Sequence, residues 1–210
     1  MRPASVGVLL AGGQARRFDG VPKGLATVDG IRIADRVLAV LRGATDTQFV
    51  VSNESAARDW FPALPVFADL QPGLGPLAGI ETALRAAAGA SVLVVAWDMP
   101  FVTTPLLRGM RALGEIGSPA VVPEHGDPPV LEPLCAWYAA ETVDVCSRLL
   151  ERGERSARSL FDALPSATRI PERVLVEHGD PDRLFLSVDT QEELEALAGL
   201  LPRLSHAPRR

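Results

Sequence analysis

The chain has 210 residues, of which 47% are hydrophobic, and this is enough to fill the core of one α/β domain. Its formal net charge of −5 at pH 7 excludes a general nucleic-acid binder, which would be basic. No apolar stretch approaches the roughly 18 residues of a membrane helix, and the first residues lack the apolar core of a signal peptide, so we expect a cytoplasmic protein.

The first predicted element is a buried strand over residues 8–11, an apolar run that ends in two glycines. Gly12 and Gly13 let backbone N–H groups face a ligand, and the cations Arg17 and Lys23 follow shortly afterwards. Exposed amides beside cations suit a polyphosphate, so this loop is a candidate site for a nucleoside triphosphate. The alternative is an ordinary tight turn, since neither the P-loop nor the Rossmann fingerprint is present.

Apolar runs bounded by turn residues predict further strands along the chain. These runs cover residues 48–52, 65–68, 91–97, 119–123, 134–138 and 184–188. The run at 91–97 is apolar after Ser91, which is typical of a central parallel strand covered on both faces.

Helices are predicted between most of these strands from the helical spacing of apolar residues. One begins near Ile33 and another at Pro76, where a proline fits the first helical turn. Thr104 is the predicted N-cap of a third helix, with Pro105 as its first residue. Two more helices are expected at about 139–151 and 156–164, and a capping box at Thr190 opens a final one.

The alternation of strands and helices indicates a single three-layer α/β domain over residues 1–204. Its sheet is expected to be mainly parallel and Rossmann-like, with helices on both faces. The segment 115–188 alternates less cleanly, which predicts a small antiparallel portion. Residues 205–210 are expected to form a flexible C-terminal tail.

Two other features raise the question of metal or redox chemistry, and a structural role is favoured for both. Cys135 and Cys146 lie far from a C-x-x-C spacing, so we expect buried free thiols. The sequence E-H-G-D-P occurs at 124–128 and again at 177–181. Histidines and carboxylates suggest a metal site, but Gly-Asp-Pro is also a strong turn signal, and nothing around the two copies repeats.

Polar residues stand at the ends of several predicted strands. Ser52 and Asn53 end one strand, Asp69 ends the next, and Asp98 ends the most apolar one. Because the carboxyl ends of parallel strands meet at one edge of a sheet, these side chains are expected to share a crevice with the glycine loop. Asp98 could there bind a Mg²⁺ that bridges substrate phosphates, or it could simply form a turn.

Gly73 and Gly75 precede the helix that begins at Pro76. They predict either an anion or base contact at a helix N-terminus, or an ordinary loop and cap. Taken together, these residues suit attack on the α-phosphate of a nucleoside triphosphate. The protein would position the reactants and neutralise charge, without a covalent nucleophile.

Four motifs resemble those of one known family. The stretch L-A-G-G-Q-A-R-R-F-D-G-V-P-K at 10–23 resembles the signature L-A-G-G-x-S-x-R-M-G-x-D-K of the MobA-like nucleotidyltransferases. G-P-L-A-G at 75–79 and W-D-M-P-F at 97–101 resemble that family's G-P-L-A-G and C-D-M-P-F segments. V-D-T-Q-E-E-L at 188–194 resembles its closing N-T-P-E-E-L. The resemblance covers nearly the whole chain.

This resemblance implies a molybdenum cofactor guanylyltransferase, which transfers GMP from GTP to molybdenum-bound molybdopterin with Mg²⁺ and releases pyrophosphate. Arg17, Lys23 and Asp98 are implied as catalytic residues, and Asp98 as the metal ligand. The implied nucleotide-binding residues are Leu10, Ala11, Gly12, Gly13, Lys23, Ser52, Asn53, Asp69, Gly75 and Asp98. The implied pterin-side residues are Arg155, Arg158, Ser187 and Asp189. Transient contact with molybdoenzymes or other cofactor-synthesis proteins is also expected, and the sequence is silent on oligomeric state.

The chain departs from the family pattern inside the first motif. Asp19 replaces a glycine, Pro22 replaces an acidic residue and Phe18 replaces a methionine, while Asp189 stands where asparagine is common. The alternatives are a relative that uses CTP or another phosphorylated acceptor, and a non-catalytic nucleotide-binding partner. A sugar-phosphate nucleotidyltransferase is a third alternative, although the chain is short and has no C-terminal repeat domain.

Overall fold

The first strand, β1 (Ser5–Leu10), is largely buried, as predicted, and lies in the middle of the sheet. It pairs in parallel with β6 (Thr47–Val51) on one side and with β8 (Ser91–Ala96) on the other. β6 pairs in parallel with the edge strand β7 (Val66–Phe67). The computed structural model describes residues 5–12, 17–18 and 21–187 of the chain. Because these four strands are parallel, they end at one edge of the sheet, which we call the carboxyl edge.

The other half of the sheet holds the predicted antiparallel portion. β11 (Cys135–Tyr138) is antiparallel to β8 and to β9 (Ala120–His125), which in turn pairs with β10 (Val130–Leu131). The strand order is β10-β9-β11-β8-β1-β6-β7, and β12 (Thr168–Pro171) pairs in parallel with β9. Two short hairpins lie outside this sheet: β2 (Arg17–Phe18) with β3 (Val21–Pro22), and β4 (Thr27–Val28) with β5 (Ile31–Arg32).

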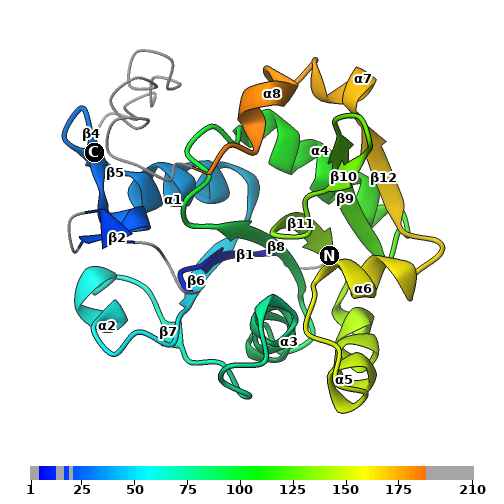
Figure 1. The fold of residues 1–210 in the computed structure, drawn as a ribbon, viewed down its shortest axis with the longest axis horizontal. Helices are drawn as coiled ribbons and strands as arrows, with labels where there is room; N and C mark the ends of the chain where they lie inside the picture. Colours follow the sequence, from blue (N-terminus) through cyan, green and yellow to red (C-terminus); the bar gives the residue numbers. More distant parts are fainter. Residues whose placement is uncertain (1–4, 13–16, 19–20, 188–210) are drawn as a thin grey trace.

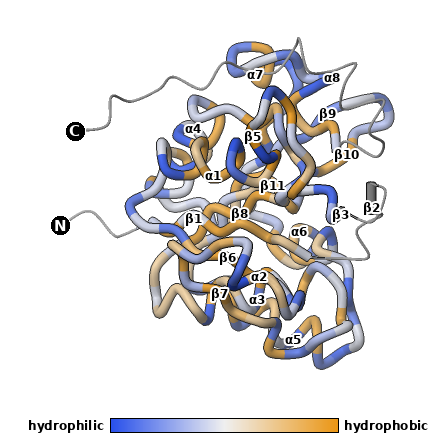
Figure 2. The backbone as a smooth tube through the Cα atoms, turned by 90° about the vertical axis from the view of Figure 1, so that its left-hand side faces the viewer, coloured by the Kyte–Doolittle hydropathy of each residue, from blue (hydrophilic) through white to orange (hydrophobic). Residues whose placement is uncertain are grey.

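Helices cover both faces of the sheet and complete the three layers (Figure 1). α1 (Ile33–Ala44) and α4 (Thr104–Glu115) pack on one face. α3 (Pro76–Ala86), α5 (Val143–Glu151) and α6 (Arg158–Asp162) pack on the other. The central strands β1 and β8 therefore bury both of their faces, and Figure 2 shows hydrophobic residues along them in the middle of the molecule.

The short helical elements connect these layers. They are η1 (Lys23–Leu25), α2 (Ala57–Trp60), η2 (Ala140–Thr142), α7 (Glu172–Leu175) and α8 (Pro181–Leu184). In the described part of the chain, no helix is long and apolar enough to cross a membrane.

Two sequence predictions about these elements are wrong. The strand expected at 184–188 is not formed over 184–187, because Asp180 caps α8 by accepting a hydrogen bond from the Asp182 N–H, at 3.2 Å, and Leu184 ends that helix. The N-cap of α4 is Thr103 rather than Thr104, since the Thr103 hydroxyl accepts a hydrogen bond from the Leu106 N–H. The final helix predicted at Thr190 and the domain end at 204 lie outside the described residues.

The two cysteines lie in the core, and the two copies of the E-H-G-D-P sequence lie in turns. Cys135 and Cys146 are buried free thiols, and burial raises the pKa of both, that of Cys146 to about 12. Each E-H-G-D-P copy forms a turn: the first joins β9 to β10, and the second joins α7 to α8. Among the described residues, no three histidine, cysteine or acidic side chains gather as a metal site would require.

Candidate active site

A cavity of about 600 Å³ opens at the carboxyl edge of the sheet. Seven of the predicted nucleotide-binding residues line it: Leu10, Gly12, Ser52, Asn53, Asp69, Gly75 and Asp98. They come from the ends of β1, β6, β7 and β8 and from the start of α3. The parallel topology therefore brings together residues that are up to 88 positions apart in sequence, from Leu10 to Asp98, as predicted.

The loop after β1 forms one wall of this cavity. Ala11 is fully buried beneath it, and its N–H donates a hydrogen bond to the Val51 carbonyl at 2.9 Å. Gly12 is exposed, and a Cβ added there would meet nothing within 4 Å, so a ligand can approach the backbone directly. Arg17 lies in β2, paired with Pro22, whereas Gly13 and Asp19 fall outside the described residues.

Asn53 and Asp69 hold each other at the ends of β6 and β7. The Asn53 amide donates to the Asp69 carboxylate at 2.7 Å, and the Asp69 N–H donates back to the Asn53 side-chain oxygen at 2.8 Å. Burial raises the pKa of Asp69, and the Asn53 hydrogen bond opposes that shift. Ser52 is buried next to them, and its N–H donates to the Phe67 carbonyl at 2.8 Å. This arrangement presents fixed hydrogen-bond acceptors to the cavity.

The glycine lip before α3 is shaped by contact with the segment that precedes α6. Gly75 has φ 79°, and a Cβ added there would lie 2.9 Å from the Arg155 carbonyl oxygen. That same carbonyl accepts a hydrogen bond from the Leu77 N–H at 3.2 Å. One of the free amides at the α3 N-terminus is therefore already used, and the lip contributes shape more than anion-binding donors.

Of the predicted catalytic residues Lys23 and Asp98, only Asp98 is among the described residues that line the cavity. Lys23 begins η1 and is 7% exposed, and Asp98 follows Trp97 directly after β8 and lines the cavity. A carboxylate here, with room beside it for phosphate oxygens and water, is the kind of oxygen ligand that Mg²⁺ takes in nucleotide sites. The described residues place no group of three histidine, cysteine or acidic side chains at this point.

The predicted pterin-side residues are less tightly grouped. The Arg155 backbone touches the glycine lip, while Arg158 begins α6 and Ser187 follows α8, with both side chains exposed. None of these three is among the described residues that line the cavity, and Asp189 lies outside the described part of the chain.

Several residues of the cavity were not predicted. Trp97 and Glu54 line it beside the proposed residues, as do Val51 and Leu134. Apolar residues at strand ends carry no local signal that separates a cavity wall from the core. The sequence carries one signal for Trp97, since this residue replaces the cysteine of the family's C-D-M-P-F segment and directly precedes Asp98.

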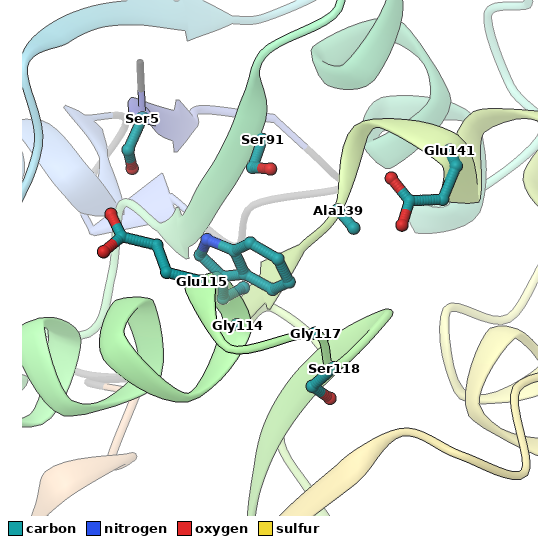
Figure 3. Close-up of a pocket in the computed structure, with 9 residues that line it drawn as sticks. Ser5, Ser91, Gly114, Glu115, Gly117, Ser118, Ala139 and Glu141 are labelled. Atoms are coloured by element: carbon teal, nitrogen blue, oxygen red, sulfur yellow. The ribbon is translucent and has the colours of Figure 1, made fainter. Parts of the chain in front are cut away.

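A second cavity, of about 170 Å³, lies at the opposite edge of the sheet, near Ser5 and Ser91 at the starts of β1 and β8. Figure 3 shows Gly114 and Glu115, from the end of α4, beside it. No residue proposed for nucleotide binding lines this cavity in the described part of the chain. The carboxyl-edge cavity is therefore the candidate active site.

Comparison with known proteins identifies the family that this chain resembles in sequence and fold. The profile of a family described as "MobA-like NTP transferase domain" matches residues 7–169. A protein of Desulfosudis oleivorans named "Molybdenum cofactor guanylyltransferase" is 31% identical over 194 residues, covering 91% of this chain and 93% of its own length. One with the same name from Burkholderia vietnamiensis is 31% identical, with 93% and 96% covered. The crystal structure of molybdopterin-guanine dinucleotide biosynthesis protein A from Archaeoglobus fulgidus superposes with a TM-score of 0.76 at 25% identity, covering 93% of this chain and 97% of that one.

Proposed function

This chain belongs to the MobA-like NTP transferase family, and we propose that it is a molybdenum cofactor guanylyltransferase. In this reaction GMP is transferred from GTP to molybdenum-bound molybdopterin, and pyrophosphate is released. The observation that carries the proposal is the convergence of the strand-end residues and the glycine loop on one cavity of about 600 Å³. A cavity of that size falls in the range typical of small-molecule sites.

The base would lie near the Asn53–Asp69 pair. Guanine presents an N–H donor and an adjacent amino group, and an ionised Asp69 offers a carboxylate that can accept from them. Because a 2.7 Å hydrogen bond from the Asn53 amide fixes the orientation of that carboxylate, the acceptor is already in place before the nucleotide arrives. Ser52, buried at the same strand end, would complete the base and ribose wall.

The triphosphate would lie along the loop after β1. Gly12 leaves the backbone open to the phosphates, while Lys23 and Arg17 would neutralise their charge. A Mg²⁺ held by Asp98 and by phosphate oxygens would supply further charge neutralisation at the α-phosphate. The terminal phosphate of molybdopterin would attack that phosphorus, one P–O bond forming as the bond to pyrophosphate breaks, so no protein nucleophile is required.

The residues of the acceptor side and the cellular setting are proposed from the family resemblance and from the composition of the chain. Arg155, Arg158, Ser187 and Asp189 are proposed to face the pterin, and residues 1–204 to form the single domain, with 205–210 as a tail. We place the reaction in the cytoplasm, where reducing conditions keep Cys135 and Cys146 as thiols. Transient contact with molybdoenzymes or other cofactor-synthesis proteins would pass the product on.

Pyrophosphate release, measured with each nucleoside triphosphate and with or without molybdenum-loaded molybdopterin, tests the proposal. We expect release with GTP and Mg²⁺ only when the acceptor is present. Activity with CTP but not GTP would instead establish a cytidylyl transferase. Binding of GTP without release in any mixture would favour a non-catalytic nucleotide-binding protein.

Asp98→Asn tests the metal role separately. It should abolish Mg²⁺-dependent release while leaving the melting temperature close to that of the parent protein. Asp59→Asn, an exposed carboxylate on α2, is the matched control and should leave release unchanged. If Asp98→Asn kept its turnover, Asp98 would not be the metal ligand.

A further inference from the structure

Trp97 occupies a junction at the edge of the candidate active site. It is 2% exposed, lines the cavity and directly precedes Asp98. The backbone N–H of Trp97 donates a hydrogen bond to the Leu10 carbonyl at 3.1 Å, which fixes this part of the backbone to the end of β1. Trp60, from α2, stacks on its indole with ring centroids 6.0 Å apart and planes inclined by 23°. The backbone of Trp97 is therefore held by β1, and its ring is held against Trp60.

The same indole is in close contact with the segment that carries Lys23. Gly24 is the next residue after Lys23, and a Cβ added to it would lie 2.4 Å from the Cδ2 and Cε3 atoms of Trp97. Real Cβ atoms do not approach other atoms this closely, so the backbone of Gly24 is pressed against the ring face. The ring therefore contacts the residue that follows Lys23 and belongs to the residue that precedes Asp98.

We propose that Trp97 is a positioning residue, which sets the place of Lys23 relative to Asp98 around the triphosphate. The inference rests on the proposed function, because it assumes that both groups act on the same phosphates. An indole has only two rotatable side-chain bonds and does not compress, and its partners hold it still. Any displacement of the ring therefore moves the cation, the carboxylate, or both.

Gly24→Ala is the direct perturbation, and the chain itself offers a matched control. Gly114, in α4, lies on the indole of Trp137 at the same distance: its added Cβ would also lie 2.4 Å from ring atoms. That contact is beside the cavity at the opposite edge of the sheet (Figure 3). Both variants press a methyl group against a buried tryptophan, but only Gly24→Ala does so next to the candidate active site.

The expected difference follows from the size of the displacement. An ordinary contact begins at 3.4 Å, so a methyl group at 2.4 Å must push the ring or the Lys23 segment back by about 1 Å. A misplacement of about 1 Å at reacting groups can lower turnover on the order of 10²-fold. Gly24→Ala should therefore lower kcat/KM by about that factor, while Gly114→Ala should stay within about threefold of the parent.

A binding measurement separates positioning from a general loss of packing. Calorimetry without the acceptor compares GTP plus Mg²⁺ with guanosine, which lacks the phosphates. Gly24→Ala should weaken GTP at least about tenfold and leave guanosine unchanged, because the Asn53–Asp69 pair is not disturbed. Gly114→Ala should weaken neither. Equal weakening of GTP and guanosine in Gly24→Ala, or equal behaviour of the two variants, would overturn the proposal.

A compensating change gives a second test. Trp97→Cys removes the ring that the new methyl group would strike, so Gly24→Ala combined with Trp97→Cys should bind GTP better than Gly24→Ala alone. If Gly24→Ala does not fold, Trp97→Phe replaces it, with Trp137→Phe as its control and the same two ligands. Should the parent protein release no pyrophosphate with any nucleotide, the proposed function fails, while the comparison of GTP with guanosine still decides the role of Trp97.

Discussion

The hydrogen-bonded pair of Asn53 and Asp69 gives the sharpest quantitative prediction. Asn53→Ala removes the amide that donates to the carboxylate at 2.7 Å and the oxygen that accepts the Asp69 N–H at 2.8 Å. A hydrogen bond to a charged group contributes about 1.5–3 kcal/mol, and a neutral one about 1 kcal/mol. Because Asn53 is exposed, solvent replaces part of both, so we expect a net loss of about 1–2 kcal/mol.

That loss should be visible in thermal melts and should depend on pH. For a domain of this size it corresponds to a fall of about 2–8 °C in melting temperature. Burial raises the pKa of Asp69 above its ordinary value of 3.8, so the folded protein binds this proton more tightly than the unfolded chain does. The carboxyl therefore contributes stability that is present at low pH and lost as the pH rises through the folded-state pKa.

Removing Asn53 should raise the pKa of Asp69 further, because the amide is the group that lowers it. The pH range over which the Asp69 carboxyl loses its contribution to folding stability should then extend to higher pH in the variant than in the parent. An uncharged Asp69 also accepts less well from guanine, so the KM for GTP should rise more at about pH 5 than at about pH 8. Gln48→Ala, which removes amide contacts to Thr45 near the start of β6, is the control. A variant that melted and bound GTP as this control does, at every pH, would refute the reasoning.

Further variants test the lip, the helix cap and the core. In Gly75→Ala the backbone has φ 79° and the new Cβ would lie 2.9 Å from a backbone oxygen, so the affinity for GTP should fall roughly tenfold. Gly73→Ala has a similar φ of 82° but open space around the new Cβ, so it should show only backbone strain. Thr103→Ala should cost about 1 kcal/mol in denaturant melts, and Thr103→Ser should recover it. Leu107→Ala, fully buried, should cost about 2–5 kcal/mol in the same melts, whereas the exposed Leu70→Ala should change them by less than about 0.5 kcal/mol.

The parallel half of the fold could be predicted because its strands are covered on both faces. Residues 92–97 are all apolar, which is typical of a central strand covered on both faces. The strand β12 was missed because Thr168–Pro171 contains one buried apolar residue, Ile170, and is held mainly by its pairing with β9. Likewise, residues 184–188 have the composition of a strand, but Asp180 caps the helix α8, which begins at Pro181 and includes Leu184.

The candidate site could be predicted as far as strand ends reveal it. Asp69 and Asp98 follow apolar runs, and topology alone brings them to one edge. The mutual hydrogen bonds of Asn53 and Asp69 could not be foreseen, since they depend on the register of β6 with β7. The contact of Gly24 with Trp97 depends in the same way on tertiary packing, because 73 positions separate the two residues in sequence.

The two buried thiols make this chain a convenient host for chemical reporters. The thiolate is the form that reacts with maleimides and disulfide reagents, and a pKa raised to about 12 leaves almost none of it at Cys146 near neutral pH. Cys135 is fully buried and its pKa is also raised. A cysteine introduced at the exposed Pro72, beside the glycine lip, would therefore carry a fluorophore or spin label by itself, in a chain that keeps both native cysteines. Such a label would follow the glycine lip as nucleotide and acceptor arrive.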